Sequence, residues 1–112
     1  ILVSEGYHRR EIPIETLAAT TSRNVAALYN LAGKGRIAPG YDADFAVVDP
    51  DATKVVRHSD YPSHSDYSPY EGMELRGAVT HTILRGMLLS ENGRLAEATD
   101  AAPRGKYLFR AH

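Results

Sequence analysis

Two histidines and two aspartates between residues 58 and 66 are of types that could bind a metal ion. They are His58, Asp60, His64 and Asp66. Imidazole and carboxylate groups are both usual zinc ligands. Five residues separate the two histidines, however, which matches no face of a helix, and the surrounding stretch is polar. We therefore interpret the group as part of a solvated loop, and a small zinc-binding protein is the alternative hypothesis.

Serine and glutamate side chains close to these histidines are of types that take part in hydrolysis. Ser65 or Ser68 could pair with His64, but no nucleophile-elbow pattern surrounds either serine. Their proline and tyrosine neighbours favour turn formation instead. Glu71 and Glu74 could act as a general acid and base, yet nothing in the sequence desolvates them or separates their pKa values. We interpret both glutamates as charges of a loop and a strand edge.

A lysine between two glycines is arranged like part of a phosphate-binding loop. The full motif is absent, because Lys34 is followed by glycine and Arg36 where the motif has a hydroxyl residue. His8 and His81 stand apart from the other candidates, and such histidines are usually exposed or hydrogen-bonded. We therefore assign no catalytic, cofactor-binding or metal-ligating residue to this chain.

Composition excludes several classes of protein. Thirteen basic and fourteen acidic residues give a formal charge of −1, so no broad positive field is available to attract nucleic acid. No apolar run approaches the ~20 residues that a membrane span needs, and the start has no signal segment. The sequence has no cysteine, which excludes disulfides and thiolate metal sites. We expect a cytoplasmic protein that binds neither membranes nor nucleic acid.

The first third of the chain is predicted to be helical. A helix is expected to begin near Pro13, because proline is tolerated in a first helical turn. Hydroxyl side chains follow, and we predict that Ser22 caps a second short helix over residues 23–29. The apolar residues that recur at helical offsets are Ile14, Leu17, Ala18, Val25 and Ala26.

The pattern then changes to that of strands. The continuous apolar run at residues 45–48 predicts a buried strand, and residues 53–57 predict a second one. Residues 78–85 and 87–89 are separated by Gly86, which predicts an antiparallel hairpin. The stretch between these strand pairs is polar and rich in tyrosine and serine, so we expect a long loop there.

These elements predict a mixed α+β fold that is not complete by itself. We divide the chain into terminal helices (1–32), sandwich strands (33–57 and 78–92), a long loop (58–77) and a C-terminal docking tail (93–112). The helices and strands are too few to close a core of either class. The sequence also opens on Ile1 without a methionine, which we take as a start inside an element whose earlier turns are missing.

Three segments of the sequence resemble one enzyme superfamily. Residues 34–49, K-G-R-I-A-P-G-Y-D-A-D-F-A-V-V-D, resemble the C-terminal signature of the amidohydrolase superfamily. Residues 22–31 are similar to its segment S-x-N-x-A-x-L-(F/Y)-x-L, although Val25 stands where the family usually has proline. Residues 65–86 resemble the branch that contains dihydroorotase, dihydropyrimidinase (hydantoinase) and allantoinase. The chain thus resembles the C-terminal part of a cyclic amidohydrolase.

This resemblance implies a fold and a chemistry. The family has a (β/α)8 barrel and a small composite β-sandwich built from both chain ends, so the chain would supply the last barrel helices and C-terminal sandwich strands. Two divalent metals, zinc being expected, are held by histidines, an aspartate and a carbamylated lysine. The metals activate a hydroxide that opens a ring amide. None of these ligands matches a position of this chain, so the resemblance implies that the segment alone is inactive.

Two further expectations concern partners. The remainder of the parent chain is expected to complete the fold, and the family resemblance implies a homo-oligomer. Tyr61, Tyr67 and Tyr70 could pack against the barrel or contact another subunit, because tyrosine is favoured at interfaces. The alternative to a hydrolase segment is a noncatalytic assembly module derived from the same family.

Overall fold

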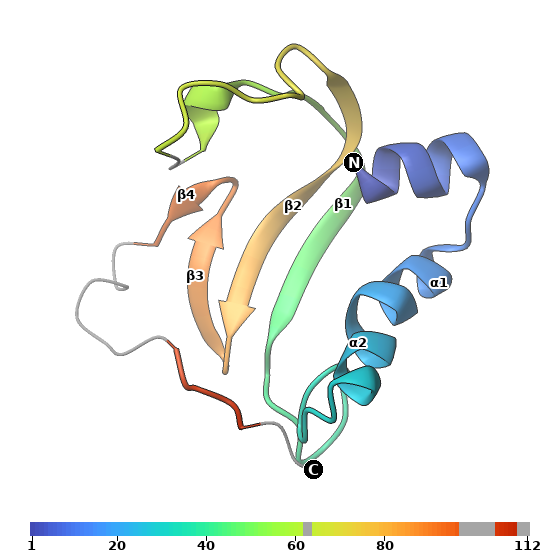
Figure 1. The fold of residues 1–112 in the computed structure, drawn as a ribbon, viewed down its shortest axis with the longest axis vertical. Coiled ribbons are helices and arrows are strands. Elements are labelled where there is room, and N and C mark those ends of the chain that lie inside the picture. Colours follow the sequence, from blue (N-terminus) through green and yellow to red (C-terminus); the bar gives the residue numbers. More distant parts are fainter. Residues whose placement is uncertain (62–63, 97–104, 110–112) are drawn as a thin grey trace.

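The computed structural model describes residues 1–61, 64–96 and 105–109. It is a mixed α+β structure in which a helical segment is followed by a four-stranded antiparallel sheet of order β1-β2-β3-β4. The helical segment lies beside β1, at one edge of the sheet (Figure 1). No helix among the described residues is long and apolar enough to span a membrane.

The helical segment contains two runs of helix. The first is the π-helix η1, which is followed by a residue of positive φ, Glu11 (φ 55°), where the direction of the chain changes. The second starts after Pro13, as predicted, and continues without a break to Leu28. The helical elements are η1 (Leu2–Arg9), α1 (Ile14–Ala18), η2 (Ala19–Arg23) and α2 (Asn24–Leu28).

The prediction that Ser22 caps a separate second helix is wrong. The backbone stays helical through this region, and α2 has no side-chain cap. The hydroxyls of Thr20 and Thr21 instead donate to carbonyls of the preceding turn, at 2.9 Å to Thr16 O and 2.7 Å to Leu17 O. Such back-bonding satisfies the hydroxyl groups inside the helix, which here widens to π geometry rather than ending.

One long strand replaces the two short strands predicted at residues 45–48 and 53–57. An irregularity between Asp49 and Thr53 interrupts its pairing with β2 but does not end the strand. The Asp49 carboxylate accepts hydrogen bonds from the amides of Asp51 and Ala52, at 2.9 and 3.2 Å, and so stabilises the bulged backbone. The strands are β1 (Phe45–Val55), β2 (Glu74–Leu84), β3 (Met87–Glu91) and β4 (Arg94–Leu95).

The predicted hairpin is confirmed as the antiparallel pair β2 and β3. Arg85 and Gly86 connect the two strands with φ angles of 47° and 80°, the signs that a type I′ turn requires. Asn92 and Gly93 repeat this arrangement between β3 and β4. The loop that was expected over residues 58–77 contains a short 3₁₀ helix, η3 (His58–Asp60), and it ends where β2 begins at Glu74.

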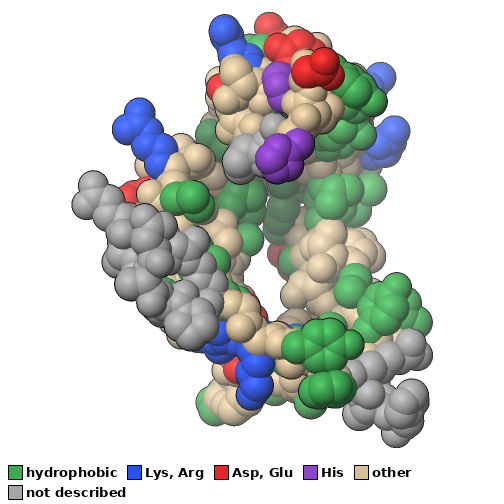
Figure 2. All heavy atoms as spheres, turned by 60° about the vertical axis from the view of Figure 1, so that its left-hand side comes forward, with side chains coloured by type: hydrophobic (Ala, Val, Ile, Leu, Met, Phe, Trp, Pro, Cys, Tyr) green, Lys and Arg blue, Asp and Glu red, His purple; other side chains and the backbone are tan. Residues whose placement is uncertain are grey.

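The chain buries little of its own apolar surface. Ala26 and Val56 are the buried hydrophobic residues among those described. The radius of gyration is 15.7 Å, whereas a compact domain of this length has about 13 Å. In the space-filling view, open space separates two sides of the molecule, and hydrophobic side chains are visible on its walls (Figure 2).

The strand at residues 45–48 was predicted to be buried, and in this structure it is not. Val47 and Val48 are 45% and 38% exposed. The apolar run is typical of a strand covered on both faces, but no described segment of this chain packs over these two side chains closely enough to bury them. The sequence pattern therefore predicts burial of these valines, and the described residues of this chain do not bury them.

Two contacts connect η1 to the sheet. The side chain of Val3 lies against Gly77 of β2, where a Cβ atom would come within 2.7 Å of Val3 Cβ. His8 Nε2 is 2.7 Å from the carbonyl oxygen of Pro50 in β1, a hydrogen bond in which the ring nitrogen donates. Gly77 has φ 101° as well, so both its conformation and its lack of a side chain are required.

The contact between Val3 and Gly77 predicts that alanine destabilises the protein more at position 77 than at position 72. Gly72→Ala introduces a side chain at φ 78° into open space, so it should cost only the backbone strain of about 1–2 kcal/mol. Gly77→Ala carries the same strain and also a clash with Val3, which adds about 1–3 kcal/mol. The thermal unfolding midpoints of the two variants of the protein would show this order, and equal midpoints would contradict the contact.

Candidate functional site

The strongest polar cluster in the described structure is built around a lysine at the end of the helical segment. Lys34 Nζ lies 2.7 Å from Asp42 Oδ2 and also forms an ion pair with Asp44 Oδ2. The lysine side chain is only 17% exposed and the Asp44 side chain 29%. We call Lys34, Asp42 and Asp44 the lysine clasp.

Asp44 connects the clasp to the turn between β2 and β3. Its second carboxylate oxygen, Oδ1, accepts a hydrogen bond of 2.8 Å from the backbone N–H of Arg85. The neighbouring carbonyl of Ala43 accepts another, of 2.9 Å, from the N–H of Gly86. The clasp therefore joins the loop after α2 to the far end of the hairpin. It fixes the place where the helical segment passes into the sheet.

These contacts shift the pKa values of two clasp residues in opposite directions. The hydrogen bonds that Lys34 donates to the Asp42 and Asp44 carboxylates raise the pKa of Lys34, and this effect outweighs the desolvation that lowers it. The hydrogen bond from Lys34 lowers the pKa of Asp44, and the Arg85 amide lowers it further. Both shifts favour the charged forms, so the clasp is an ion pair at neutral pH. Neither group is poised to exchange a proton.

Close packing brings the clasp loop onto α2. Gly35 has φ 81°, and a Cβ at this position would lie 2.7 Å from the Cβ of Ala26 and 3.0 Å from the Ser22 carbonyl oxygen. The Asp42 N–H donates to the carbonyl of Gly33 at 2.9 Å, which closes the loop at its base. Gly35 therefore allows a close approach of the loop to the helix.

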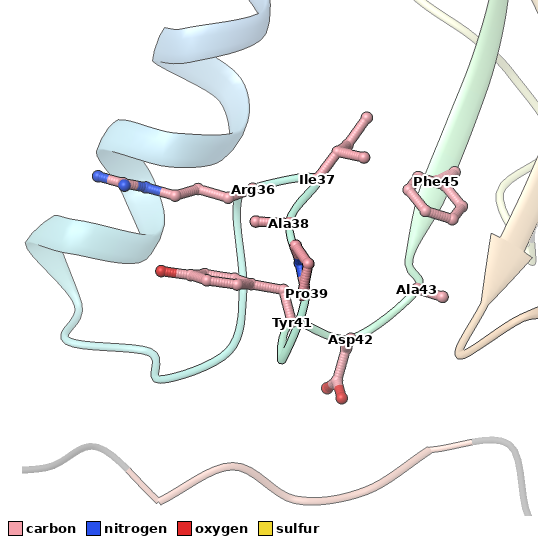
Figure 3. Close-up of a pocket in the computed structure, with 8 residues that line it drawn as sticks. All are labelled: Arg36, Ile37, Ala38, Pro39, Tyr41, Asp42, Ala43 and Phe45. Carbon is pink, nitrogen blue, oxygen red and sulfur yellow. The ribbon is translucent and has the colours of Figure 1, made fainter.

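A pocket opens beside the clasp. Figure 3 shows its lining, in which Arg36 and Tyr41 extend to one side and Asp42 points away from both. Asp42 is already paired with Lys34, so the lining offers no free acid and base that face each other. The lining residues are Arg36, Ile37, Ala38, Pro39, Tyr41, Asp42, Ala43 and Phe45. The pocket is suited to apolar contact, and we find no geometry in it for catalysis.

The proposed zinc ligands of the loop do not form a site in the structure. The described part of the chain contains no group of three or more histidine, cysteine, aspartate or glutamate residues placed to hold a metal ion. The backbone N–H of His58 donates to Glu71 at 2.6 Å, and Asp60 lies 4.0 Å from Lys54. These contacts belong to a folded loop, so the zinc hypothesis gains no support.

The serines of this loop stabilise turns. Ser65 Oγ donates to the carbonyl of Tyr67 at 3.1 Å, and the N–H of Tyr70 donates to Ser68 Oγ at 3.2 Å. The prediction that turn formation explains these serines is confirmed. His81 is hydrogen-bonded as expected, with Nδ1 at 3.0 Å from Thr80 Oγ1 and Nε2 at 3.3 Å from Glu91.

The residues missed at the sequence level are those of the clasp. Asp44 binds the amide of Arg85, which is 41 residues away in the sequence. Lys34 was considered only as a phosphate ligand. The signal that could have identified the clasp is a lysine followed by two aspartates on alternate positions of a glycine-bounded loop.

Comparison with known proteins identifies the family of the chain. The model of the family described as "Amidohydrolase family" matches residues 7–102. The chain belongs to the amidohydrolase family. The resemblance to the cyclic amidohydrolases is thereby confirmed, and the chain is a portion of a protein of the allantoinase, hydantoinase and dihydropyrimidinase group.

Curated relatives and solved structures agree on this family. An allantoinase of Rubrobacter xylanophilus is 44% identical over 96% of this chain and 23% of its own length. One of Desulfitobacterium hafniense is 37% identical over the same shares. The structure of L-hydantoinase (dihydropyrimidinase) from Arthrobacter aurescens matches with a TM-score of 0.79 at 29% identity, over 85% of this chain and 21% of that one. The amidohydrolase chain thus spans about a quarter of the length of these relatives.

The clasp predicts different costs for removing its two carboxylates. Asp44→Asn loses the ion pair and weakens the bond from Arg85, which should cost about 1.5–3 kcal/mol of unfolding free energy. Asp42→Asn removes only a more exposed ion pair and should cost about 0–1 kcal/mol. Denaturant unfolding of the full-length protein with each variant measures the difference. A larger cost for Asp42→Asn would contradict the assigned role of Asp44.

The pKa shifts predict how the clasp responds to pH. The lowered pKa of Asp44 gives stability that is present above its ordinary value of 3.8 and is lost as the pH falls through the folded value. The raised pKa of Lys34 gives stability that is present below 10.5 and is lost as the pH rises through the folded value. The stability difference between wild type and Asp44→Asn should therefore be constant at neutral pH and shrink below pH 3.8. A stability difference between wild type and Asp44→Asn that stays constant down to pH 2 would contradict the lowered pKa of Asp44.

Proposed function

We propose that this chain is the C-terminal segment of a metal-dependent cyclic amidohydrolase and that its own contribution is structural. The observation that carries the proposal is the 44% identity to an allantoinase over nearly the whole chain, of which the chain covers only 23%. The exposed apolar side chains support it, because they require a cover that the described residues do not supply.

The proposed reaction is hydrolysis of a ring amide. Allantoin is the first candidate substrate, because the most similar relatives described above are allantoinases, at 44% and 37% identity. Hydantoin and dihydropyrimidines come next, since the matching L-hydantoinase structure is 29% identical. Dihydroorotate remains the third candidate from the sequence resemblance. The residues that choose among these rings are expected in barrel loops of the parent protein.

Two divalent metals, zinc being expected, would supply a hydroxide at neutral pH and polarise the carbonyl oxygen of the ring amide. The described residues of this chain do not fit that pair of metals, because no group of suitable side chains comes together. The histidines, aspartate and carbamylated lysine of the family are therefore expected elsewhere in the parent. In this chain the Lys34 clasp maintains the connection between helices and sheet.

The same proposal gives each segment a place in the parent. Residues 1–32 would be terminal helices of a (β/α)8 barrel, and residues 33–57 and 78–92 would be strands of a composite β-sandwich. Residues 58–77 would connect them, and residues 93–112 would dock as a tail. The antiparallel sheet supports the sandwich assignment, and its connection to the helices through Asp44 supports a fixed position of sandwich on barrel.

A noncatalytic assembly module is the second candidate function. The exposed tyrosines Tyr61, Tyr67 and Tyr70 favour it, since tyrosine is common in protein interfaces. If the chain is instead a segment of a cyclic amidohydrolase, the same tyrosines would contact the barrel or a second subunit of a homo-oligomer.

The test compares the full-length polypeptide with the 112-residue chain. Each is stripped of metal, reloaded with zinc and assayed for ring opening of allantoin, hydantoin, dihydrouracil and dihydroorotate. The full-length protein should hydrolyse at least one ring only with metal, and the chain alone should hydrolyse none. Activity of the chain alone, or an inactive metal-loaded parent, would overturn the proposal, and the second result would favour the assembly module.

A further inference from the structure

The turn between β3 and β4 contains the one Asn-Gly pair of the sequence. Asn92 and Gly93 both have positive φ angles, 49° and 79°. Both residues are exposed, and a Cβ atom at Gly93 would meet no neighbouring atom. Asparagine followed by glycine favours a type I′ turn. Because glycine has no side chain, the same pair also lets a backbone nitrogen approach the asparagine side chain without hindrance.

The chemistry that this pair permits is loss of the side-chain amide. The backbone nitrogen of Gly93 attacks Cγ of Asn92, so that a new C–N bond forms while the Cγ–Nδ2 bond breaks. Nδ2 leaves as ammonia and takes the proton of the Gly93 amide, and nothing is oxidised or reduced. Water then opens the succinimide ring at either carbonyl, which leaves aspartate or isoaspartate at position 92.

The hairpin controls access to this reaction. Ring closure requires rotation about the Asn92 Cα–C bond, which the closed turn restricts, and the N–H of Asn92 donates to the carbonyl oxygen of Thr80 at 2.6 Å. The opposing feature is the shortness of β4, which has two residues and makes two described residue pairs with β3 at one edge of the sheet. So few pairs make local opening of the hairpin easy.

We propose that Asn92 is a site of spontaneous deamidation and that opening of the β3–β4 hairpin controls its rate. Aspartate at this position adds a negative charge next to Glu91, which already lies 3.3 Å from His81. Isoaspartate carries the main chain through its side-chain carbon and so adds one backbone atom to the turn. Since turn length fixes the register of a hairpin, this product weakens the pairing of β4 with β3.

Peptide mass spectrometry of the full-length protein tests the proposal, and Asn30 is a matched control in the same chain. Asn30 is also exposed and has φ 50°, but it is followed by Leu31, whose side chain hinders the approach that glycine permits. The folded protein is aged in mildly alkaline buffer, where the attacking nitrogen loses its proton more readily. Digestion in water enriched in heavy oxygen then marks any conversion that occurs during digestion.

The peptide that contains Asn92 should gain about one mass unit as its amide becomes a carboxylate. Fragmentation should place this gain at Asn92, where conversion should be at least about tenfold faster than at Asn30. Conversion should be faster still in urea, because the turn no longer restricts rotation. Asn92→Gln keeps the amide but moves it one carbon further from the backbone, so this variant should lose the mass gain.

Three results would overturn the proposal. Equal rates at Asn92 and Asn30 would show that the Asn-Gly pair has no special reactivity in this protein. A mass gain that persists in the same peptide of Asn92→Gln would place the reaction elsewhere. Equal rates at Asn92 in the folded and the urea-unfolded protein would remove the control by the hairpin.

Discussion

Apolar surface on this chain exceeds what the chain can bury, and the rest of the structure follows from that imbalance. Ala26 and Val56 are the buried hydrophobic residues of the described segments, while valines on both faces of β1 remain in contact with solvent. Burial of such side chains is the main favourable term in folding. Local hydrogen bonds and ion pairs therefore define the shape of this segment, and the apolar surface records the contacts that its parent protein would supply.

The lysine clasp shows how such a segment can still have a defined geometry. Asp44 uses one carboxylate oxygen for Lys34 and the other for the amide of Arg85, so a single side chain holds three separate parts of the chain together. The charges are partly shielded from water, which makes their mutual attraction stronger than that of an exposed pair. Gly35 brings the same loop onto α2. The contacts of this charged cluster thus give it an architectural role.

Two groups of residues that were candidate ligand sites in the sequence have structural contacts instead. The glycine-bounded Lys34 pairs with two aspartates, and His58 with its acidic neighbours belongs to a folded loop. Under the proposed function, this segment would support the position of the barrel relative to the sheet. The pocket beside Tyr41 and Phe45 is consistent with that role, because its lining is mostly apolar.

The sequence by itself determined the helix start at Pro13, the β2–β3 hairpin and the family, because turn residues and signature motifs act locally. It did not determine that residues 45–55 form one strand, that Ser22 lies within a helix, or that Asp44 reaches Arg85. The single strand and the Asp44 contact depend on residues far away in the chain, which local propensity does not encode. At Ser22 the helix continues because the neighbouring threonine hydroxyls bond carbonyls of the preceding turn. Only the tertiary structure shows these outcomes. It also shows that the apolar run at residues 45–48, which the sequence pattern predicted to be buried, is exposed to solvent in this chain.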